Sequence, residues 1–385
     1  MGATFDQKCY NVRSSALRYM FIEIDKNLAL SENNGNYNAP MTLSHTSITD
    51  IKWWLANITD MKATIHVPEY GKIIFSDASK EGWGAHSDGV QANGRWTDLE
   101  QKQNINVLEL LAAKFALFSF CKSSIPSHIR LMLDNTTAVS YINHQGGTIS
   151  VACNKVSRDM WEWAEQNHTW ISAAHVPGTI NTIADSESRQ FDDDTEWSLT
   201  DTIFSIIVNK FGMPDIDMFA TRMNAKTQKY VSWRPDPGCI AVDAFYTPWD
   251  YSLIYCFPPF SVIWRTIAKI RREEAEAIVI VPLWHTQSWF PYGMQMLVDY
   301  PIVFPANLVN LYLPNKPQLA HPMKKLYLGA LRLSGKLYKS TTFLNKLRAS
   351  YNHHGGPAHR ADMKMYLPNG KYIVVNKTQI PFILV

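Results

Sequence analysis

Short apolar runs alternate with amphipathic stretches in the first half of the chain. Runs typical of strands occupy 72–76, 82–86, 90–96, 129–133 and 169–175, and stretches typical of helices occupy 107–121, 136–144 and 152–166. Asp88-Gly89, between the second and third runs, is a tight-turn signal. A last helix is expected around Asn181 and Asp185. This order of elements predicts an α/β fold with a mixed sheet flanked by helices.

The same pattern outlines the rest of the chain. Helices are expected at 12–25 and 46–58, joined by a polar connector, and the adjacent Trp53 and Trp54 are expected to pack in a core. An acidic run at 192–194 marks a domain boundary. Beyond it, helices at 199–211, 261–275 and 292–298 alternate with strands at 216–220, 252–257 and 277–281. This alternation predicts a second α/β unit with parallel strands.

Composition narrows the class of protein. The five cysteines are scattered without a Cys-x-x-Cys pair, so a disulfide framework or zinc ribbon is not expected and a reducing compartment fits. No signal peptide or membrane span is recognised, so we expect an intracellular protein, cytoplasmic, nuclear or both. The segment 316–364 contains ten Lys or Arg residues and only one acidic residue, Asp362. This stretch is either a phosphate-contacting strip or a solvated basic face or tail.

Four acidic residues lie where they could hold a divalent cation. Asp77 and Asp134 each end an apolar run, Glu109 opens a helix, and Asp185 lies in the last helix. Carboxylates that converge on one edge of a sheet suit Mg²⁺ or Mn²⁺, which prefer oxygen ligands. Two such ions, roughly 3.5–4 Å apart, can activate a water and stabilise the leaving oxygen in phosphodiester cleavage. The sequence therefore predicts a metal site.

Each acid also has a structural explanation when it is taken alone. Asp77 could cap a turn, Glu109 has capping-box spacing from Asn106, and Asp134 could be a helix N-cap. Asp185 could be a surface residue. The four together favour the metal site. His175, at a strand end, could shuttle protons or be a satisfied core histidine.

The sequence motifs around these acids resemble those of a known family. The motifs are Asp77-Ala-Ser-x-x-Gly-Trp-Gly-Ala, Trp96-x-x-x-Glu100, Ile105-Asn-Val-Leu-Glu-Leu-Leu-Ala, Asp134-Asn and His175-Val-Pro-Gly-x-x-Asn-x-x-Ala-Asp-x-x-Ser-Arg. They resemble type 1 ribonuclease H over about 120 residues, in the version found in DIRS-like retrotransposon polyproteins. One departure is Asn104, where that family often has His.

The resemblance implies an activity and a set of residues for it. The activity is hydrolysis of the RNA strand of RNA–DNA hybrids. The metal-binding acids would be Asp77, Glu109, Asp134 and Asp185, with His175 assisting proton transfer. The substrate contacts would be Asn181, Asn135 and Ser79. The reverse transcriptase of the same element is an expected partner, and a non-catalytic nucleic-acid-binding remnant is the alternative.

The second half resembles the adenine methyltransferase-like region of the same elements. The motifs are Asp217-Met-Phe-Ala-x-Arg-x-Asn224, Trp233-x-Pro-Asp-Pro, Val242-Asp-Ala-Phe-x-x-x-Trp249 and Phe257-Pro-Pro-Phe260. Amino-methyltransferases place Asp or Asn before Pro258 and Pro259, where this chain has Phe257, which cannot hold a target amine. The motif is therefore degenerate, and S-adenosylmethionine is not favoured as a cofactor.

We divide the chain accordingly into four segments. These are a lead-in at 1–65 that resembles the reverse transcriptase connection, a ribonuclease H-like domain at 66–192, a methyltransferase-like domain at 193–348 and an unassigned tail at 349–385.

Overall fold

The chain folds into two compact units, Met1–Phe191 and Asp192–Val385. The computed structural model describes residues 15–60, 69–122, 125–191, 197–306, 311–316, 319, 321–323, 325–347, 372–375 and 378–385. The acidic run at 192–194 and most of the predicted tail lie outside these ranges.

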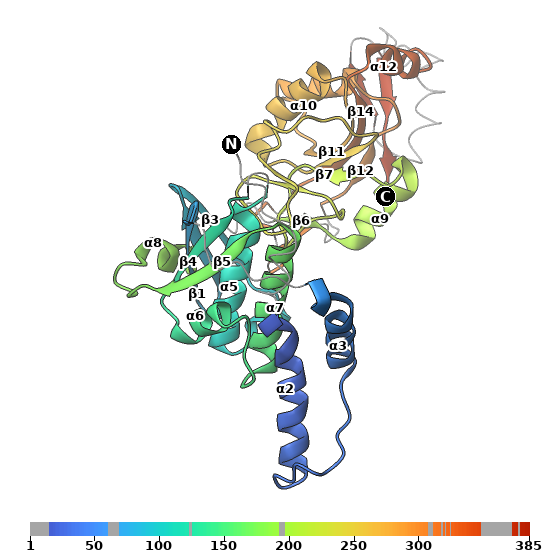
Figure 1. Cartoon of the computed structure of the whole chain (residues 1–385). Helices are drawn as coiled ribbons and strands as arrows, with labels where there is room; N and C mark the ends of the chain where they lie inside the picture. The colour runs from blue at the N-terminus through green and yellow to red at the C-terminus, as the bar shows by residue number, and fades with distance from the viewer. Residues whose placement is uncertain are drawn as a thin grey trace, which may run out of the picture. The chain divides into compact units, whose positions relative to one another are not determined.

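A five-stranded mixed sheet forms the centre of the first unit (Figure 1). Its strands are β1 (Lys72–Ala78), β2 (Gly82–Ser87), β3 (Val90–Arg95), β4 (His128–Leu133) and β5 (Trp170–His175), in the order β3-β2-β1-β4-β5. The first three form an antiparallel meander, and β1, β4 and β5 are parallel. The predicted turn is present, with positive φ at Asp88 and Gly89. The predicted fold class is confirmed.

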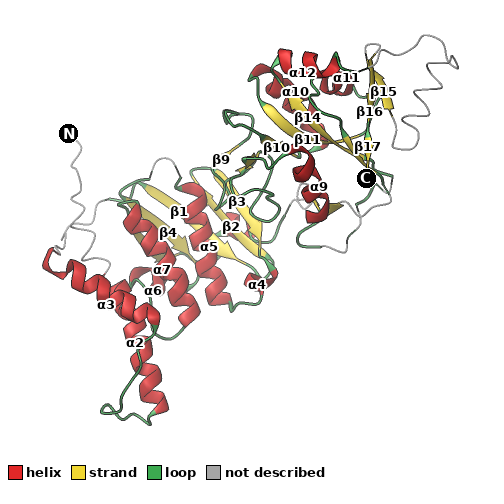
Figure 2. Cartoon of the chain, turned by 90° about the vertical axis from the view of Figure 1, so that its right-hand side faces the viewer, coloured by secondary structure: helices red, strands yellow, loops and turns green. Residues whose placement is uncertain are grey.

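Helices flank this sheet. They are α4 (Asp98–Gln101), α5 (Ile105–Phe120), α6 (Thr136–Asn143), α7 (Val151–Gln166) and α8 (Thr182–Glu187). Of these, α5, α6 and α7 lie together on one side of the sheet in Figure 2. Trp83 of β2 packs against Phe115 of α5, whereas the next residue, Gly84, faces α8. Successive strand residues point to opposite faces, so α5 and α8 lie on opposite faces of the sheet.

The lead-in helices, α2 (Ser15–Glu32) and α3 (His45–Asn57), pack against α7 through buried charges. Asp50 of α3 is fully buried, and its carboxylate accepts hydrogen bonds from both terminal nitrogens of Arg158 at 2.7 and 2.8 Å. Arg18 of α2 lies 3.5 Å from the same carboxylate. Trp53 and Trp54 are half-buried rather than core residues, and the Arg18 guanidinium lies over the Trp53 ring.

The second unit contains a six-stranded sheet in the order β17-β12-β14-β11-β10-β7. Its strands are β7 (Ile216–Asp217), β10 (Ile254–Cys256), β11 (Glu276–Pro282), β12 (Ile302–Phe304), β14 (Leu328–Ser334) and β17 (Ile383–Leu384). The main helices are α9 (Asp201–Phe211), α10 (Ile263–Arg272), α11 (Trp289–Gln295) and α12 (Leu337–Leu344).

The prediction of parallel strands is correct for the three strands that the sequence indicated, β7, β10 and β11, whereas β14 is not among the predicted strands and runs in the opposite direction to β11. β14 is antiparallel to both β11 and β12. Parallel neighbours need a long crossover, usually a helix, and no helix is described between β12 and β14. A short buried apolar run does not itself encode strand direction.

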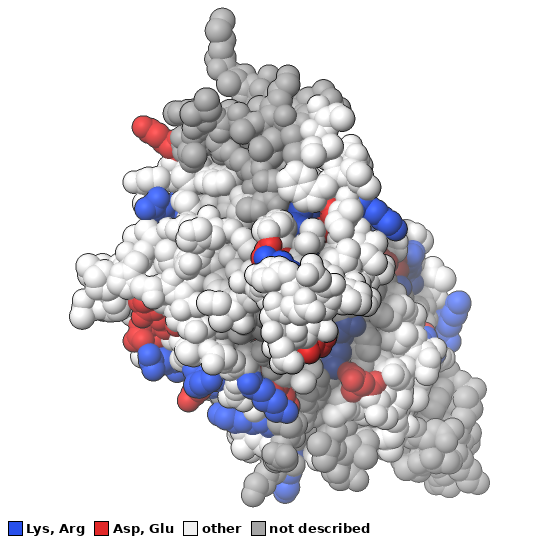
Figure 3. All heavy atoms as spheres, turned by 60° about the horizontal axis from the view of Figure 1, so that its bottom comes forward, with Lys and Arg blue, Asp and Glu red and all other residues white. Residues whose placement is uncertain are grey.

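Charges in the described residues are mixed. Of the predicted basic strip, Arg332 and Lys339 both pair with Glu276, and residues 348–371 lie outside the described ranges. On the face shown in Figure 3, basic and acidic residues lie among large uncharged areas. Cys121, Cys153, Cys239 and Cys256 are free and buried, whereas Cys9 is not described. Among the described helices, none combines the length and apolarity needed to cross a bilayer.

Candidate metal centre

Three of the predicted acids meet at one edge of the first sheet. Asp77 is near the end of β1, Asp134 directly follows β4, and Glu109 comes from the second turn of α5. One carboxylate oxygen from each lies within 4.8 Å of the others. Since β1 and β4 are adjacent and parallel, their carboxyl ends necessarily meet at the same edge. Asp134 is partly exposed, which leaves the cluster accessible to solvent on one side.

Burial and charge crowding act together on Glu109. Its side chain is only 5% exposed, and its Oε2 atom has no hydrogen-bond partner among the described residues. Burial, followed by the charges of Asp77 and Asp134, raises the pKa of Glu109 to about 9, although a backbone hydrogen bond from Ala78 opposes this. Burial, together with Asp134 and Asp185, also raises the pKa of Asp77.

These properties fit a divalent cation. An unpaired buried polar atom costs free energy, and crowded carboxylates repel one another. A cation bound by Asp77, Glu109 and Asp134 would remove both penalties, and oxygen-only ligands match Mg²⁺ or Mn²⁺. The three acids could therefore hold a metal ion.

Asp185, the fourth predicted acid, lies beside this cluster without belonging to it. Its side chain is 45% exposed, and its Oδ1 accepts hydrogen bonds from the Arg189 guanidinium at 2.6 and 2.9 Å. Its charge is nevertheless close enough to contribute to the raised pKa of Asp77. Its metal-binding role stays a prediction.

The helix caps exclude the capping roles that were considered for Glu109 and Asp134. Asn104 is the N-cap of α5, so Glu109 is not at the capping-box position, and a capping box is instead formed by Thr97 and Glu100. Asn135, not Asp134, is the N-cap of α6, where its Oδ1 accepts from the Ala138 amide at 2.9 Å.

His175 is exposed at the end of β5 and pairs in register with Leu133, the residue before Asp134. It is therefore not a core histidine, and its strand ends beside the cluster. Gly178, in the loop that follows, comes close to Asp134, because a Cβ there would lie 3.4 Å from the Asp134 Oδ2 atom.

The predicted substrate contacts have structural partners. Asn181 is fully buried and donates to the Ser76 carbonyl at 3.1 Å, which ties the start of α8 to β1. The Ser79 hydroxyl donates to the Ser188 carbonyl at 2.5 Å and accepts from the Gly82 amide. The Asn135 side chain caps α6 through its Oδ1 atom, and its Nδ2 group donates a hydrogen bond to the Asn106 Oδ1 atom. Neither Asn181 nor Ser79 is presented to a substrate in this arrangement, and their predicted contacts are untested.

Sequence reasoning assigned no role to Ser188 and Gly84. Ser188 is fully buried, and its hydroxyl donates to the Asp77 Oδ2 atom at 2.8 Å. A Cβ at Gly84 would lie 2.3 Å from the Ser188 amide nitrogen and 2.4 Å from the Ala184 carbonyl oxygen. Gly84 thus lets α8 approach the sheet closely enough for Ser188 to orient Asp77. A glycine inside a strand was the available signal.

The degenerate motif of the second unit borders a pocket of about 350 Å³. Phe257, Pro258, Pro259 and Phe260 line it. No described residue that lines this pocket carries a carboxylate or amide that could hold an amine. Asp217 is fully buried, and its two oxygens accept from the Phe219 and Lys226 amides at 3.1 and 3.2 Å.

The strand order, the flanking helices and the acidic edge define the first unit as a ribonuclease H-like α/β fold. Its solved structural neighbours include ribonuclease H1 from the halophilic archaeon Halobacterium salinarum NRC-1, 18% identical, covering 30% of this chain and 92% of that one, with a TM-score of 0.22. They also include the foamy viral protease-reverse transcriptase in complex with an RNA/DNA hybrid, 13% identical, covering 43% of this chain and 28% of the viral chain, with a TM-score of 0.22.

The same viral protein in complex with double-stranded DNA is 12% identical over 46% of this chain and 40% of the viral chain, with a TM-score of 0.20. TM-scores this low do not define a fold, so the fold class depends on the topology itself. No protein-family model matches the chain, and no curated protein matches it either.

Proposed function

We propose that this chain is a metal-dependent endonuclease of the ribonuclease H type 1 class, which hydrolyses the RNA strand of RNA–DNA hybrids. The observation that carries the proposal is the convergence of Asp77, Glu109 and Asp134, with an unpaired buried oxygen on Glu109. Carboxylates arranged for structural purposes alone would have hydrogen-bond donors as partners.

Asp77, Glu109 and Asp134 would hold Mg²⁺ or Mn²⁺, and Asp185 would join them by exchanging its ion pair with Arg189. The bound metal would supply a deprotonated water at neutral pH and neutralise charge that develops on the phosphate. Ser188 fixes the orientation of the Asp77 carboxylate, so that its second oxygen stays available. His175, exposed beside Asp134, would accept or return a proton.

The substrate would be recognised by shape and by its 2′-hydroxyl groups, because an A-form-like duplex offers few base edges to side chains. The motifs resemble those of DIRS-like retrotransposon polyproteins, so we propose the reverse transcriptase of such an element as the source of hybrid and as the partner. No described feature of the second unit favours methyl transfer.

Strand-specific cleavage tests this proposal. The full chain is incubated with Mg²⁺ or Mn²⁺ and four labelled duplexes of one sequence: RNA–DNA, RNA–RNA, DNA–DNA and a hybrid whose RNA strand carries 2′-O-methyl groups. We expect cleavage of the RNA strand of the first duplex alone, with 5′-phosphate and 3′-hydroxyl ends. Binding of the hybrid without metal-dependent cleavage would instead identify a non-catalytic remnant.

A further inference from the structure

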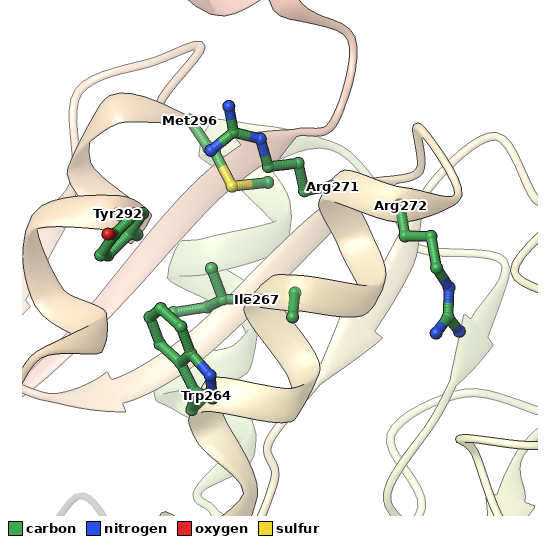
Figure 4. A pocket seen from close by; sticks show the side chains of 7 residues that line it. Trp264, Ile267, Arg271, Arg272, Tyr292 and Met296 are labelled. Carbon is green, nitrogen blue, oxygen red and sulfur yellow. The ribbon is translucent and has the colours of Figure 1, made fainter.

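The second unit has another pocket, of about 370 Å³, between α10 and the end of α11. Trp264, Ile267 and Arg271 come from α10, Tyr292 comes from α11, and Met296 directly follows it. The side chains of Ile267 and Met296 are buried and line its inner side, as Figure 4 shows. None of these residues belongs to the degenerate motif at 257–260.

Two aromatic side chains flank this pocket and stay largely exposed. Trp264 is 45% exposed and Tyr292 is 46% exposed, and their ring centroids lie 5.0 Å apart at an interplanar angle of 80°. Single exposed aromatic residues are ordinary on protein surfaces. Here two neighbouring rings pack edge-to-face beside a hollow with an apolar base, and exposed aromatic surface of this kind can pack against another flat ring.

A cation without an acidic partner borders the same pocket. Of the three basic residues in the last turn of α10, Lys269 and Arg272 pair with Glu273 at 2.6 and 3.1 Å. Arg271 is exposed and makes no ion pair with any residue that the structure describes. Its side chain lies beside Met296, whereas Arg272 points away from the other side chains (Figure 4). The pocket thus combines aromatic surfaces with two arginines, of which Arg271 has no acidic partner among the described residues and points toward the pocket.

We propose that this pocket binds one nucleotide of a single-stranded nucleic acid, with the base against Trp264 and Tyr292 and a phosphate on Arg271. Single-strand-binding proteins combine these features, because every base has a π-face and every nucleotide a phosphate. The volume lies at the lower end of the range for small-ligand pockets, as one base with its sugar requires. A proline-rich peptide would use the rings but has no need of Arg271. The site is independent of the proposed nuclease.

Binding of a fluorescein-labelled oligothymidylate of about twelve nucleotides, within the usual span of such sites, tests the proposal by fluorescence anisotropy. The full chain is used with EDTA present, so that metal-dependent cleavage is silent. We expect Trp264→Ala and Tyr292→Ala each to weaken binding roughly 5- to 100-fold, and Trp264→Phe to retain most of the affinity. Arg271→Ala should weaken binding and reduce the slope of log affinity against log salt by about 0.7.

Trp233→Ala is the matched control, because Trp233 is 50% exposed beside Arg234 in the same unit but does not line the pocket. We expect its affinity to equal that of the wild type. Equal losses from Trp233→Ala and Trp264→Ala, or unchanged affinity in a Trp264→Ala variant with wild-type thermal stability, would overturn the proposal.

Photo-crosslinking of the wild-type chain to an oligonucleotide that carries 5-iododeoxyuridine gives a readout that does not depend on folded variants. We expect adducts on the peptides that contain Trp264 or Tyr292. Adducts confined to other peptides would contradict the site, as would a proline-rich peptide that binds at these rings when the oligonucleotide does not.

Discussion

Asp77 and Asp217 end buried strands in parallel sheet regions of the two units, yet their surroundings differ. Asp217 is 2% exposed, and each of its carboxylate oxygens accepts a backbone N–H group. Asp77 is 4% exposed, but it accepts a hydrogen bond from the Ser188 hydroxyl, and Asp134 and Glu109 lie beside it. The Asp217 carboxylate is enclosed by its own loop, whereas the Asp77 carboxylate belongs to a crowded, partly open cluster.

The pKa values show what this difference means physically. Burial raises the pKa of Asp217 to about 6, and the two backbone hydrogen bonds and Lys226 oppose it. Burial raises the pKa of Glu109 to about 9 because the neighbouring charges add to the burial effect. Burial alone therefore does not mark a functional acid. A buried acid that has an unpaired oxygen and other acids beside it is a better candidate for a cation ligand.

Neutralising one member of the cluster should have the largest effect. We expect Glu109→Gln to lower hybrid cleavage by about 100-fold or more, since loss of even an outer partner of a metal ligand costs about 10–100-fold. The same variant should lose the rise in thermal midpoint that Mg²⁺ gives the wild type. Differential scanning fluorimetry with and without Mg²⁺ measures this, and an undiminished rise would remove Glu109 from the metal site.

The pH dependence of stability without metal should also distinguish the two acids. Below pH 4.5, Glu109 is protonated in both the folded and the unfolded chain. As the pH rises from 4.5 towards 9, the unfolded chain loses this proton while the folded chain keeps it, so the free energy of unfolding falls. We expect urea unfolding in EDTA to show a smaller fall in Glu109→Gln than in the wild type.

For Asp217, the pH range over which the free energy of unfolding falls is narrower, from its ordinary pKa of 3.8 to about 6. Asp217→Asn should therefore leave the pH dependence above about pH 7 as in the wild type. If Asp217→Asn flattened the profile between pH 7 and 9 and Glu109→Gln did not, the contrast between the two sites would be reversed.

A methyl group at Gly84 should disturb the edge where α8 meets the sheet. We expect Gly84→Ala to destabilise the first unit by about 1–3 kcal/mol, because the added Cβ would overlap backbone atoms of Ala184 and Ser188. Cleavage should fall as well, because Ser188 and Asp185 would shift. Gly89→Ala is the comparison variant, since a Cβ there meets nothing within 4 Å, so any loss of stability comes from its φ of +77° and not from overlap.

Removing the Ser188 hydroxyl should have a smaller effect. Ser188→Ala leaves Asp77 without its side-chain donor, and we expect about a tenfold loss of cleavage at saturating hybrid. Ser186→Ala, two residues earlier in α8, is the matched control. Equal rates in wild type and Ser188→Ala, measured across several Mg²⁺ concentrations, would show that Asp77 is oriented by other contacts.

The first sheet and three of its acids could be predicted because local patterns determine them. Apolar runs that end in Asp77 and Asp134 place both residues at strand ends, and parallel pairing brings those ends together. The partners of these acids could not be predicted in the same way. The Ser188 hydroxyl reaches Asp77 across more than a hundred positions of the sequence, which only the folded chain brings together. The Arg189 guanidinium pairs with Asp185, and the sequence does not show whether that acid binds an arginine or a metal.

The second unit shows a different limit. Its strand–helix alternation correctly predicted the parallel β7, β10 and β11, but the direction of β14 depends on the connection that precedes it. Asp217 lies in a short segment, 216–220, that the sequence predicts as a strand, and Asp77 directly follows the predicted strand at 72–76, so both look like strand acids in the sequence. The backbone amides of Phe219 and Lys226 that enclose Asp217 become visible only when the loop is folded.

The most direct measurement compares the acids at the two strand ends in one assay. An end-labelled RNA–DNA hybrid is incubated with Mg²⁺ and wild type, Asp134→Asn or Asp217→Asn, after hybrid binding and folding of all three have been verified. We expect cleavage of the RNA strand by wild type and Asp217→Asn, and none by Asp134→Asn. Equal cleavage by Asp134→Asn, or none by a folded wild type that binds the hybrid, would contradict this expectation.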